Sequence, residues 1–301
     1  MNPARGDQVR KPRILIFVTG QLRNCVANIH NWLDVGLKGC DVEFRFDVWD
    51  DVGRVDLSKA YLRSLPTKLG GSLVQISKNN VYFAKDRILE DELDEIRRLL
   101  PNADILVYPY KEDYVKQIGA LKVTPAIKAD CSPWWRGAIP VAWINQQAWL
   151  RYEHESSDLG FDFFARFQSE VRFKNTLLSA LPLLSGEILS SPDTIDPSTG
   201  VSMKFFAGKS QAFSLLMTAF DPSIEAFKRY QSGSPPGTQP IGERYLKFLC
   251  HENQIDVRYP IRTVVDRERL IPALPAWRTR WHVAKNWTLP NLVFLQNPPT
   301  R

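Results

Sequence analysis

Short apolar runs alternate along this chain with longer segments of helical periodicity, and this alternation limits the folds it can adopt. Residues 13–19 are a continuous apolar run rich in β-branched residues that ends at Gly20, which is typical of a buried strand. Residues 42–49 alternate apolar and polar side chains, and residues 104–108 form a third strand-like run. Helices are predicted between these strands, at residues 22–37 and 86–100. The order predicts an α/β fold of the Rossmann-like kind, with a mostly parallel sheet flanked by helices.

The second half of the chain continues the alternation. After an irregular stretch at residues 110–136, a helix is predicted at 139–156 and an aromatic strand at 161–166 that continues to residue 173. The remaining predicted elements are a loop at 190–201, a strand at 205–208, helices at 210–220 and 241–253, and a strand at 255–259. We therefore expect one α/β domain over residues 13–265, a disordered basic segment at 1–12 and a basic, tryptophan-containing extension at 266–301.

Composition narrows the class of protein. With 44% hydrophobic and 24% charged residues among 301, the chain reads as a globular protein rather than a disordered or fibrous one. Its apolar runs are shorter than the roughly 18–20 residues that span a bilayer, and residues 14–18 are too few for a secretory signal. Four scattered cysteines without a C-x-x-C pair suit reduced thiols, and the four histidines lack zinc-ligand spacing. We expect a cytoplasmic protein.

The net charge of +6 lies mainly at the two ends of the chain. Residues 1–13 hold four basic residues and one acidic residue, and residues 261–301 hold seven and two, which leaves residues 14–260 at −2. The C-terminal extension also contains Trp277, Trp281 and Trp287. Such a segment suits peripheral contact with an anionic membrane, binding to nucleic acid, or simple packing back onto the body.

Two polar segments follow the first two predicted strands. Thr19-Gly20-Gln21-Leu22-Arg23 comes after the first, and Gly20 would allow close backbone approach while Gln21 and Arg23 could hold a sugar, base or phosphate. Asp50 follows the second strand and could accept hydrogen bonds from a base or ribose. Ligands of open α/β sheets bind beyond the carboxyl ends of the strands. An ordinary turn with a surface arginine, and a helix cap at Asp50, are the simpler alternatives.

A third polar segment lies inside the aromatic strand predicted at residues 161–173. Arg166, Gln168 and Glu170 have period-two spacing, so on a strand they would share one face. Arg166 could neutralise a diphosphate, and Glu170 could hold Mg²⁺ or Mn²⁺. The alternative is a structural ion pair between Arg166 and Glu170.

A fourth segment, Gly242-Glu243-Arg244, opens a predicted helix. Glu243 could point into a cleft as a general base, or it could simply complement the dipole at the helix start.

The order of these segments resembles a family of nucleotide-sugar glycosyltransferases of GT-A type that is associated with bacterial surface polysaccharides. The matching motifs are G-Q-x-R, F-D-V-W-D-D, F-D-F-F-A-R-x-Q-x-E, F-F-A-G and a Gly-Glu helix start, over residues 13–262. The family's third motif reads Tyr-Asp and then Arg-x-Arg-x-Asp, so Gln168 and Glu170 depart from it. The family also tends to have an aspartate before F-x-x-G, where this chain has Ser202-Met203-Lys204.

The resemblance implies transfer of a sugar, a hexose being the type we expect, from a nucleotide-sugar donor to a glycan or lipid-linked acceptor. Donor binding falls to Gly20, Gln21, Arg23, Asp50, Arg166 and Lys204. Glu243 is the expected base, with Asp162 as its rival, and Glu170 is the candidate metal ligand.

Three points stay open at the level of sequence. A divalent cation (Mg²⁺ or Mn²⁺) is uncertain because the chain lacks a D-x-D motif, and Lys204 could neutralise phosphate instead. The altered third motif leaves room for a non-catalytic protein that binds a nucleotide-sugar or glycan on the same fold. Nucleic-acid binding would rest on the basic ends alone, and the nearly neutral body speaks against it.

Overall fold

A computed structural model describes residues 10–22, 25–50, 89–109, 132–156, 160–181, 184–219 and 242–265. The strands are β1 (Arg13–Gly20), β2 (Asp41–Trp49), β3 (Asp104–Tyr108), β4 (Phe163–Phe167), β5 (Val171–Phe173), β6 (Ile188–Ser190), β7 (Phe205–Gly208), β8 (Val257–Arg258) and β9 (Thr263–Val265). The helices are α1 (Cys25–Asn31) with the π-helical turn η1 (Trp32–Gly36), α4 (Leu89–Leu99), α7 (Ser132–Ser156), α8 (Ser210–Met217) and α10 (Glu243–Glu252).

The described strands build one large sheet and one small one. The large sheet has seven strands in the order β3-β2-β1-β4-β7-β6-β8, and β5 pairs with β9 in the small one. Strand β1 runs parallel to both β2 and β4, and β3 and β8 also run parallel to their partners. Strand β7 is antiparallel to both its neighbours. The predicted α/β fold with a mostly parallel sheet is confirmed.

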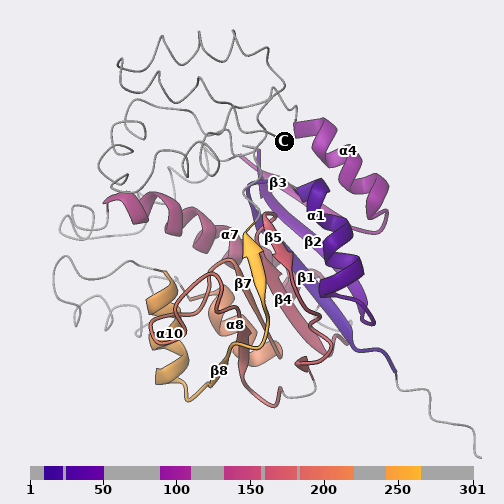
Figure 1. The fold of residues 1–301 in the computed structure, drawn as a ribbon. Helices are drawn as coiled ribbons and strands as arrows, with labels where there is room; N and C mark the ends of the chain where they lie inside the picture. The colour runs from indigo at the N-terminus through magenta and orange to yellow at the C-terminus, as the bar shows by residue number, and fades with distance from the viewer. Residues whose placement is uncertain are drawn as a thin grey trace, which may run out of the picture.

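Strand β1 lies at the centre of the parallel part because its sequence is apolar on both faces. Residues 14–18 are each at most 2% exposed, as expected for a strand covered on two sides. Helices α1 and α4 cover one face of the sheet, and α7, α8 and α10 cover the other (Figure 1). None of the described helices is long and apolar enough to cross a membrane.

The strand predicted from residue 161 to 173 is in fact two strands that belong to different sheets. Strand β4 ends at Phe167, the backbone N–H of Val171 donates to the Gln168 carbonyl at 3.0 Å, and β5 then pairs with β9. The prediction that Arg166, Gln168 and Glu170 share one strand face is therefore wrong, because a turn separates Glu170 from β4.

Other boundaries differ by less. The helix expected at 22–37 is α1 followed by η1, and the helix expected at 139–156 begins at Ser132, inside the stretch predicted to be irregular, and contains Pro140. The short strands β6 and β9 were not predicted. The segments 1–9 and 266–301 lie outside the described residues, so the proposed domain limits stay a prediction.

Candidate functional site

The carboxyl ends of β1 and β4 meet at one edge of the sheet, and most of the predicted site residues are near it. Gly20 ends β1 with a φ of +105°, a conformation that favours glycine. A Cβ built on Gly20 would meet no atom of the described residues within 4 Å, so the backbone here borders open space. The Ser169 hydroxyl donates to the Gln21 carbonyl at 2.6 Å, which ties the loop after β1 to the turn after β4.

Arg166, on β4, is a fully buried cation at this edge. Its Nε donates to Thr19 Oγ1 at 2.7 Å and to Asn145 Oδ1 at 3.0 Å, so β1 and α7 hold the guanidinium from two sides. Its two terminal nitrogens are buried without a hydrogen-bond partner among the described residues. Burial lowers the pKa of Arg166 to about 9, against the raising effect of the nearby Glu170 charge, so the group is still a cation at neutral pH.

Lys204 and Glu170 lie next along the same edge. Lys204 Nζ is 3.8 Å from Glu170 Oε1, and both side chains are mostly buried, at 21% and 7% exposed. The backbone N–H of Gln168 donates to the Lys204 carbonyl at 3.0 Å, and the Lys204 N–H donates to Ser202 Oγ at 3.1 Å. These bonds fix the segment before β7 against the turn after β4. Both cations, Arg166 and Lys204, thus interact with the Glu170 carboxylate.

Glu243 starts α10 and reaches the same cluster. The Met203 N–H donates to Glu243 Oε1 at 3.4 Å, and the Val201 N–H donates to the Glu243 carbonyl at 2.9 Å. Burial raises the pKa of Glu243, while the Met203 hydrogen bond and the Lys204 charge oppose the rise. The preceding Gly242 has a φ of +145°, which allows the sharp entry into the helix.

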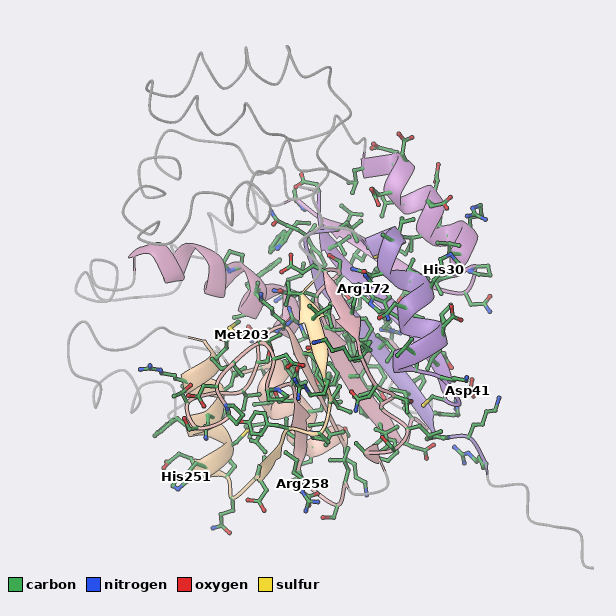
Figure 2. All side chains as sticks on the ribbon, viewed as in Figure 1. His30, Asp41, Arg172, Met203, His251 and Arg258 are labelled. Atoms are coloured by element: carbon green, nitrogen blue, oxygen red, sulfur yellow. The ribbon has the colours of Figure 1, made fainter. Side chains whose placement is uncertain are left out.

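The structure therefore brings together Arg166, Glu170, Lys204 and Glu243, which come from three separate stretches of sequence. We call these four residues the charged cluster. Figure 2 shows Met203, whose N–H contacts Glu243, far from Asp41, which begins β2 at the amino edge of the sheet. Chemically, the cluster offers positive charge to an anion and a carboxylate with raised proton affinity.

Asp162 does not lie in the charged cluster. It precedes β4 at the amino edge, where its carboxylate accepts from the Arg13 N–H at 2.8 Å and from Arg10 at 3.3 Å. The Asp162 N–H donates to the Arg13 carbonyl whereas Arg166 pairs with Phe17, so four residues of extended strand, about 13 Å, separate Asp162 from Arg166. Asp162, the rival candidate for the base, therefore lies away from the charged cluster.

Of the other two predicted donor-binding residues, the structure describes only Asp50. Asp50 is exposed just beyond β2, at the same carboxyl edge as Gly20, and its N–H donates to the Tyr108 carbonyl at 2.9 Å. Arg23 lies outside the described residues.

The described residues do not fit a divalent cation. None of them form a group of three or more His, Cys, Asp or Glu side chains that could hold a metal ion. Glu170, the predicted ligand, has the Lys204 ammonium at 3.8 Å and the Arg166 charge close by, so a dication there would meet two fixed positive charges.

Two residues that position Arg166 escaped the sequence analysis. Thr19 was noted only as the first residue of the segment Thr19–Arg23. Asn145 was not noted, because it lies in a predicted helix with many buried residues. The Thr19 hydroxyl also donates to Asn145 Oδ1 at 2.6 Å, so the three side chains form one buried network. Gln146 and Gln147 follow Asn145 directly, so no local pattern distinguished Asn145 from its polar neighbours.

Comparison with solved structures finds likenesses in fold, whereas comparison of the sequence with family models and curated proteins finds none. No protein-family model matches the chain, and no curated protein matches its sequence. The chain is similar to the crystal structure of mouse xyloside xylosyltransferase 1 in its apo form, with 8% sequence identity and a TM-score of 0.40, over 83% of this chain and 85% of that one. With a TM-score below 0.5, this likeness carries no weight for function.

Proposed function

We propose that the protein is a glycosyltransferase that moves a sugar from a nucleotide-sugar donor to a hydroxyl of an acceptor. The observation that carries this proposal is the Arg166 guanidinium, buried at the carboxyl edge of the sheet with two unpartnered terminal nitrogens. A buried cation with unsatisfied donors is costly unless enough anionic charge lies near it, and the nearby Glu170 carboxylate is shared with Lys204, which leaves two cations for one anion. A donor diphosphate bound at this edge is such an anion, and the motif order resembles that of GT-A enzymes.

Arg166 and Lys204 act on the diphosphate in different ways. The terminal nitrogens of Arg166 are covered, so its charge acts from beneath the site through a medium of low dielectric. Lys204 is partly exposed and its ammonium can contact phosphate oxygens directly. When the sugar–phosphate bond breaks, negative charge grows on the leaving diphosphate, and the two cations stabilise it.

Glu243 is the base in this proposal. Its pKa is raised by burial, which makes the carboxylate a better proton acceptor, and such a base contributes about 10²–10⁴-fold in rate. It would take the proton of the acceptor hydroxyl as that oxygen attacks the anomeric carbon. The alternative, a protein that binds nucleotide-sugars or glycans without turnover, keeps the role of the two cations and drops that of Glu243.

The first experiment is a thermal-shift panel of UDP-, GDP-, CMP- and dTDP-sugars, with and without Mn²⁺, since a ligand that binds the folded state raises the melting temperature. The donor that gives the largest shift is then used to measure nucleotide release and sugar transfer. Glu243→Gln should lower turnover about 10²–10⁴-fold with little change in donor affinity. Asp162→Asn, at the opposite edge, is the matched control and should keep full turnover.

Each outcome of these measurements separates the candidates. Binding without turnover of any donor favours the non-catalytic protein. Equal turnover in wild type and Glu243→Gln would show that Glu243 is not the base. If no donor raised the melting temperature, the proposal that the charged cluster binds a donor would be wrong. Chelation by EDTA tests the divalent cation independently.

The sugar, the acceptor and the cellular site of action are proposals that rest on the sequence alone. We propose a hexose as the sugar, a glycan or lipid-linked glycan of a bacterial surface polysaccharide as the acceptor, and a cytoplasmic site of action at the inner membrane. They rest on the motif resemblance and on the basic, tryptophan-containing residues 266–301.

A further inference from the structure

Three aromatic rings meet on the α7 side of the same sheet edge. The indoles of Trp49 and Trp143 stack with centroids 5.2 Å apart and planes 18° apart. The ring of Tyr108 stands edge-on to Trp143 at 5.5 Å and 85°. Trp49 is buried, whereas Tyr108 and Trp143 are partly exposed. We call these three residues the aromatic cluster.

Buried polar groups hold the aromatic cluster in place. The Tyr108 hydroxyl donates to Asp47 Oδ1 at 3.0 Å. Asp47 in turn accepts two bonds from Arg151 of α7, at 3.1 Å from Nε and 3.0 Å from the terminal nitrogen. A ring fixed in this way loses little conformational freedom when a ligand packs on it, and such preorganisation favours binding.

The aromatic cluster lies at the same level of the sheet as the loop after β1. Trp49 pairs with Tyr108 in register, and the residue before Trp49 pairs with Gly20. Helix α7 supplies both Trp143 and Asn145, the partner of Arg166. Strand β1 separates β2 from β4, so Trp49 and Arg166 stand on strands about 10 Å apart.

Trp143 has one ring face and one hydrogen-bond donor that the described residues do not use. One face of its indole lies on Trp49, and the only other ring it touches within the described ranges is Tyr108, which meets it edge-on. Its Nε1–H is buried and lacks an acceptor among the described residues, and an unsatisfied donor of this kind is costly.

We propose that the aromatic cluster is the platform on which the base of the donor nucleotide stacks. This inference rests on the proposed function. It adds a binding site for the base of the donor, because the charged cluster binds only the diphosphate. A heteroaromatic base has a flat π-face that stacks on Trp or Tyr. With the diphosphate at Lys204 and the base at Trp143, the ribose lies over the end of β1, where no described residue comes within 4 Å of a Cβ built on Gly20.

Isothermal titration calorimetry with two kinds of probe tests the platform. UDP, GDP, CDP and dTDP carry a base, and inorganic pyrophosphate does not. Wild type should bind its tightest nucleoside diphosphate at least tenfold more tightly than pyrophosphate. Trp143→Leu should weaken that nucleoside diphosphate about 5- to 150-fold, the range for one base on one aromatic ring, and should leave pyrophosphate within twofold.

Two controls accompany the Trp143→Leu variant. Trp143→Phe keeps a stacking ring and should recover most of the affinity. Leu150→Ala changes an exposed residue of the same helix, at 45% exposure, and should change neither affinity. Circular dichroism checks that each variant is folded.

The possible failures are distinguishable. Equal affinity of wild type for pyrophosphate and nucleoside diphosphate overturns the platform, and this result needs no variant. Unchanged nucleoside diphosphate affinity in Trp143→Leu, or an equal loss for pyrophosphate, also overturns it, and the proposed function then still stands. If Trp143→Leu raised the KM for the acceptor and left donor affinity unchanged, the aromatic cluster would bind the acceptor sugar. That result would overturn the proposal that the nucleotide base stacks there. Absence of binding by all probes overturns the proposed function itself.

Discussion

At the scale of single residues, the buried charges decide what the protein can do. Arg166 is fully buried, yet only its Nε has partners among the described residues. A purely structural arginine would have its terminal nitrogens paired as well, since broken or incomplete buried pairs are strongly destabilising. The incomplete pairing of Arg166 is therefore the feature that points to a ligand.

Replacing Arg166 separates these two roles. Arg166→Met removes a buried charge and keeps the Thr19–Asn145 hydrogen bond, so the free energy of unfolding should fall by no more than about 1 kcal/mol. Affinity for the nucleoside diphosphate should fall at least about tenfold, because charge-assisted stabilisation is lost. Urea unfolding and calorimetry measure both quantities. A loss of about 3–5 kcal/mol with unchanged affinity would make Arg166 part of a structural ion pair with Glu170.

The pKa of Glu243 gives a prediction about pH. It is raised above its ordinary value of 4.5, so the folded protein keeps this proton while the unfolded chain has already lost it. Stability must then decrease as pH rises from about 4.5 through the folded-state pKa. Glu243→Gln should remove that decrease, and the variant should gain stability relative to wild type as pH rises through this window.

The same group should set the acidic limb of the rate profile. The logarithm of kcat/KM should rise with pH with unit slope, and the midpoint should lie above 4.5. A rate that is flat from pH 4 to 8 would show that Glu243 carries no proton in the reaction.

At the scale of elements, a buried ion pair connects the sheet to α7. Asp47 on β2 is fully buried and is held by two bonds from Arg151, which also donates to Asp104 of β3 at 2.7 Å. This network holds α7 on the sheet, and α7 carries both Asn145 and Trp143. The Asp47–Arg151 pair therefore positions Asn145 and Trp143, and neither of its residues is proposed to contact the ligand.

Breaking the pair should loosen the helix. Arg151→Met leaves the Asp47 carboxylate buried with only Tyr108 as its partner in the described part of the chain, and should cost about 3–5 kcal/mol of unfolding free energy. The double variant Asp47→Asn/Arg151→Met should recover part of that loss. Arg98→Ala, which breaks the exposed pair with Glu95, is the control and should change stability little. Equal effects of Arg151→Met and Arg98→Ala would contradict the positioning role.

Sequence patterns predicted the elements whose signal is local. Strand β1, with its continuous apolar run, and helix α10, opened by Gly242-Glu243, were predicted within a few residues. The break between β4 and β5 was missed because Phe and Val continue past Phe167, and the turn depends on pairing with the distant strand β9. Pairing between distant segments leaves no mark in local periodicity.

The site was predictable only in part, for the same reason. Arg166, Glu170 and Glu243 were singled out from local motifs and Lys204 from the family resemblance, and in the structure the four residues lie close together. Asp162 was grouped with them because it matches the aspartate of the family's third motif, although it lies at the amino end of β4 and Arg166 lies near the carboxyl end. The aromatic cluster joins three elements, and each of its residues alone looks like an ordinary core side chain.

At the scale of the whole molecule, charge is divided between a nearly neutral body and basic ends. The extension at 266–301 lies outside the described residues, and we propose that it holds the enzyme near a lipid-linked acceptor. Each Lys or Arg close to an anionic surface contributes about 1 kcal/mol.

Removing the extension tests this proposal. A chain ending at residue 265 should lose most of its binding to vesicles that contain anionic lipid, measured by sedimentation, and should bind neutral vesicles as the full chain does. Binding of the full chain should weaken as salt rises. Equal binding of the two chains to anionic vesicles would remove the role of the extension, and salt-dependent binding to RNA or DNA instead would favour the nucleic-acid alternative.

The central claim is that one edge of the sheet binds one nucleotide, with the diphosphate at the charged cluster. A crystal structure of the full chain with its tightest nucleoside diphosphate measures this directly. We predict phosphate oxygens within hydrogen-bond distance of Lys204 Nζ, beyond the carboxyl ends of β1 and β4. Phosphate density at the opposite edge, near Asp162 and Arg13, would contradict the account.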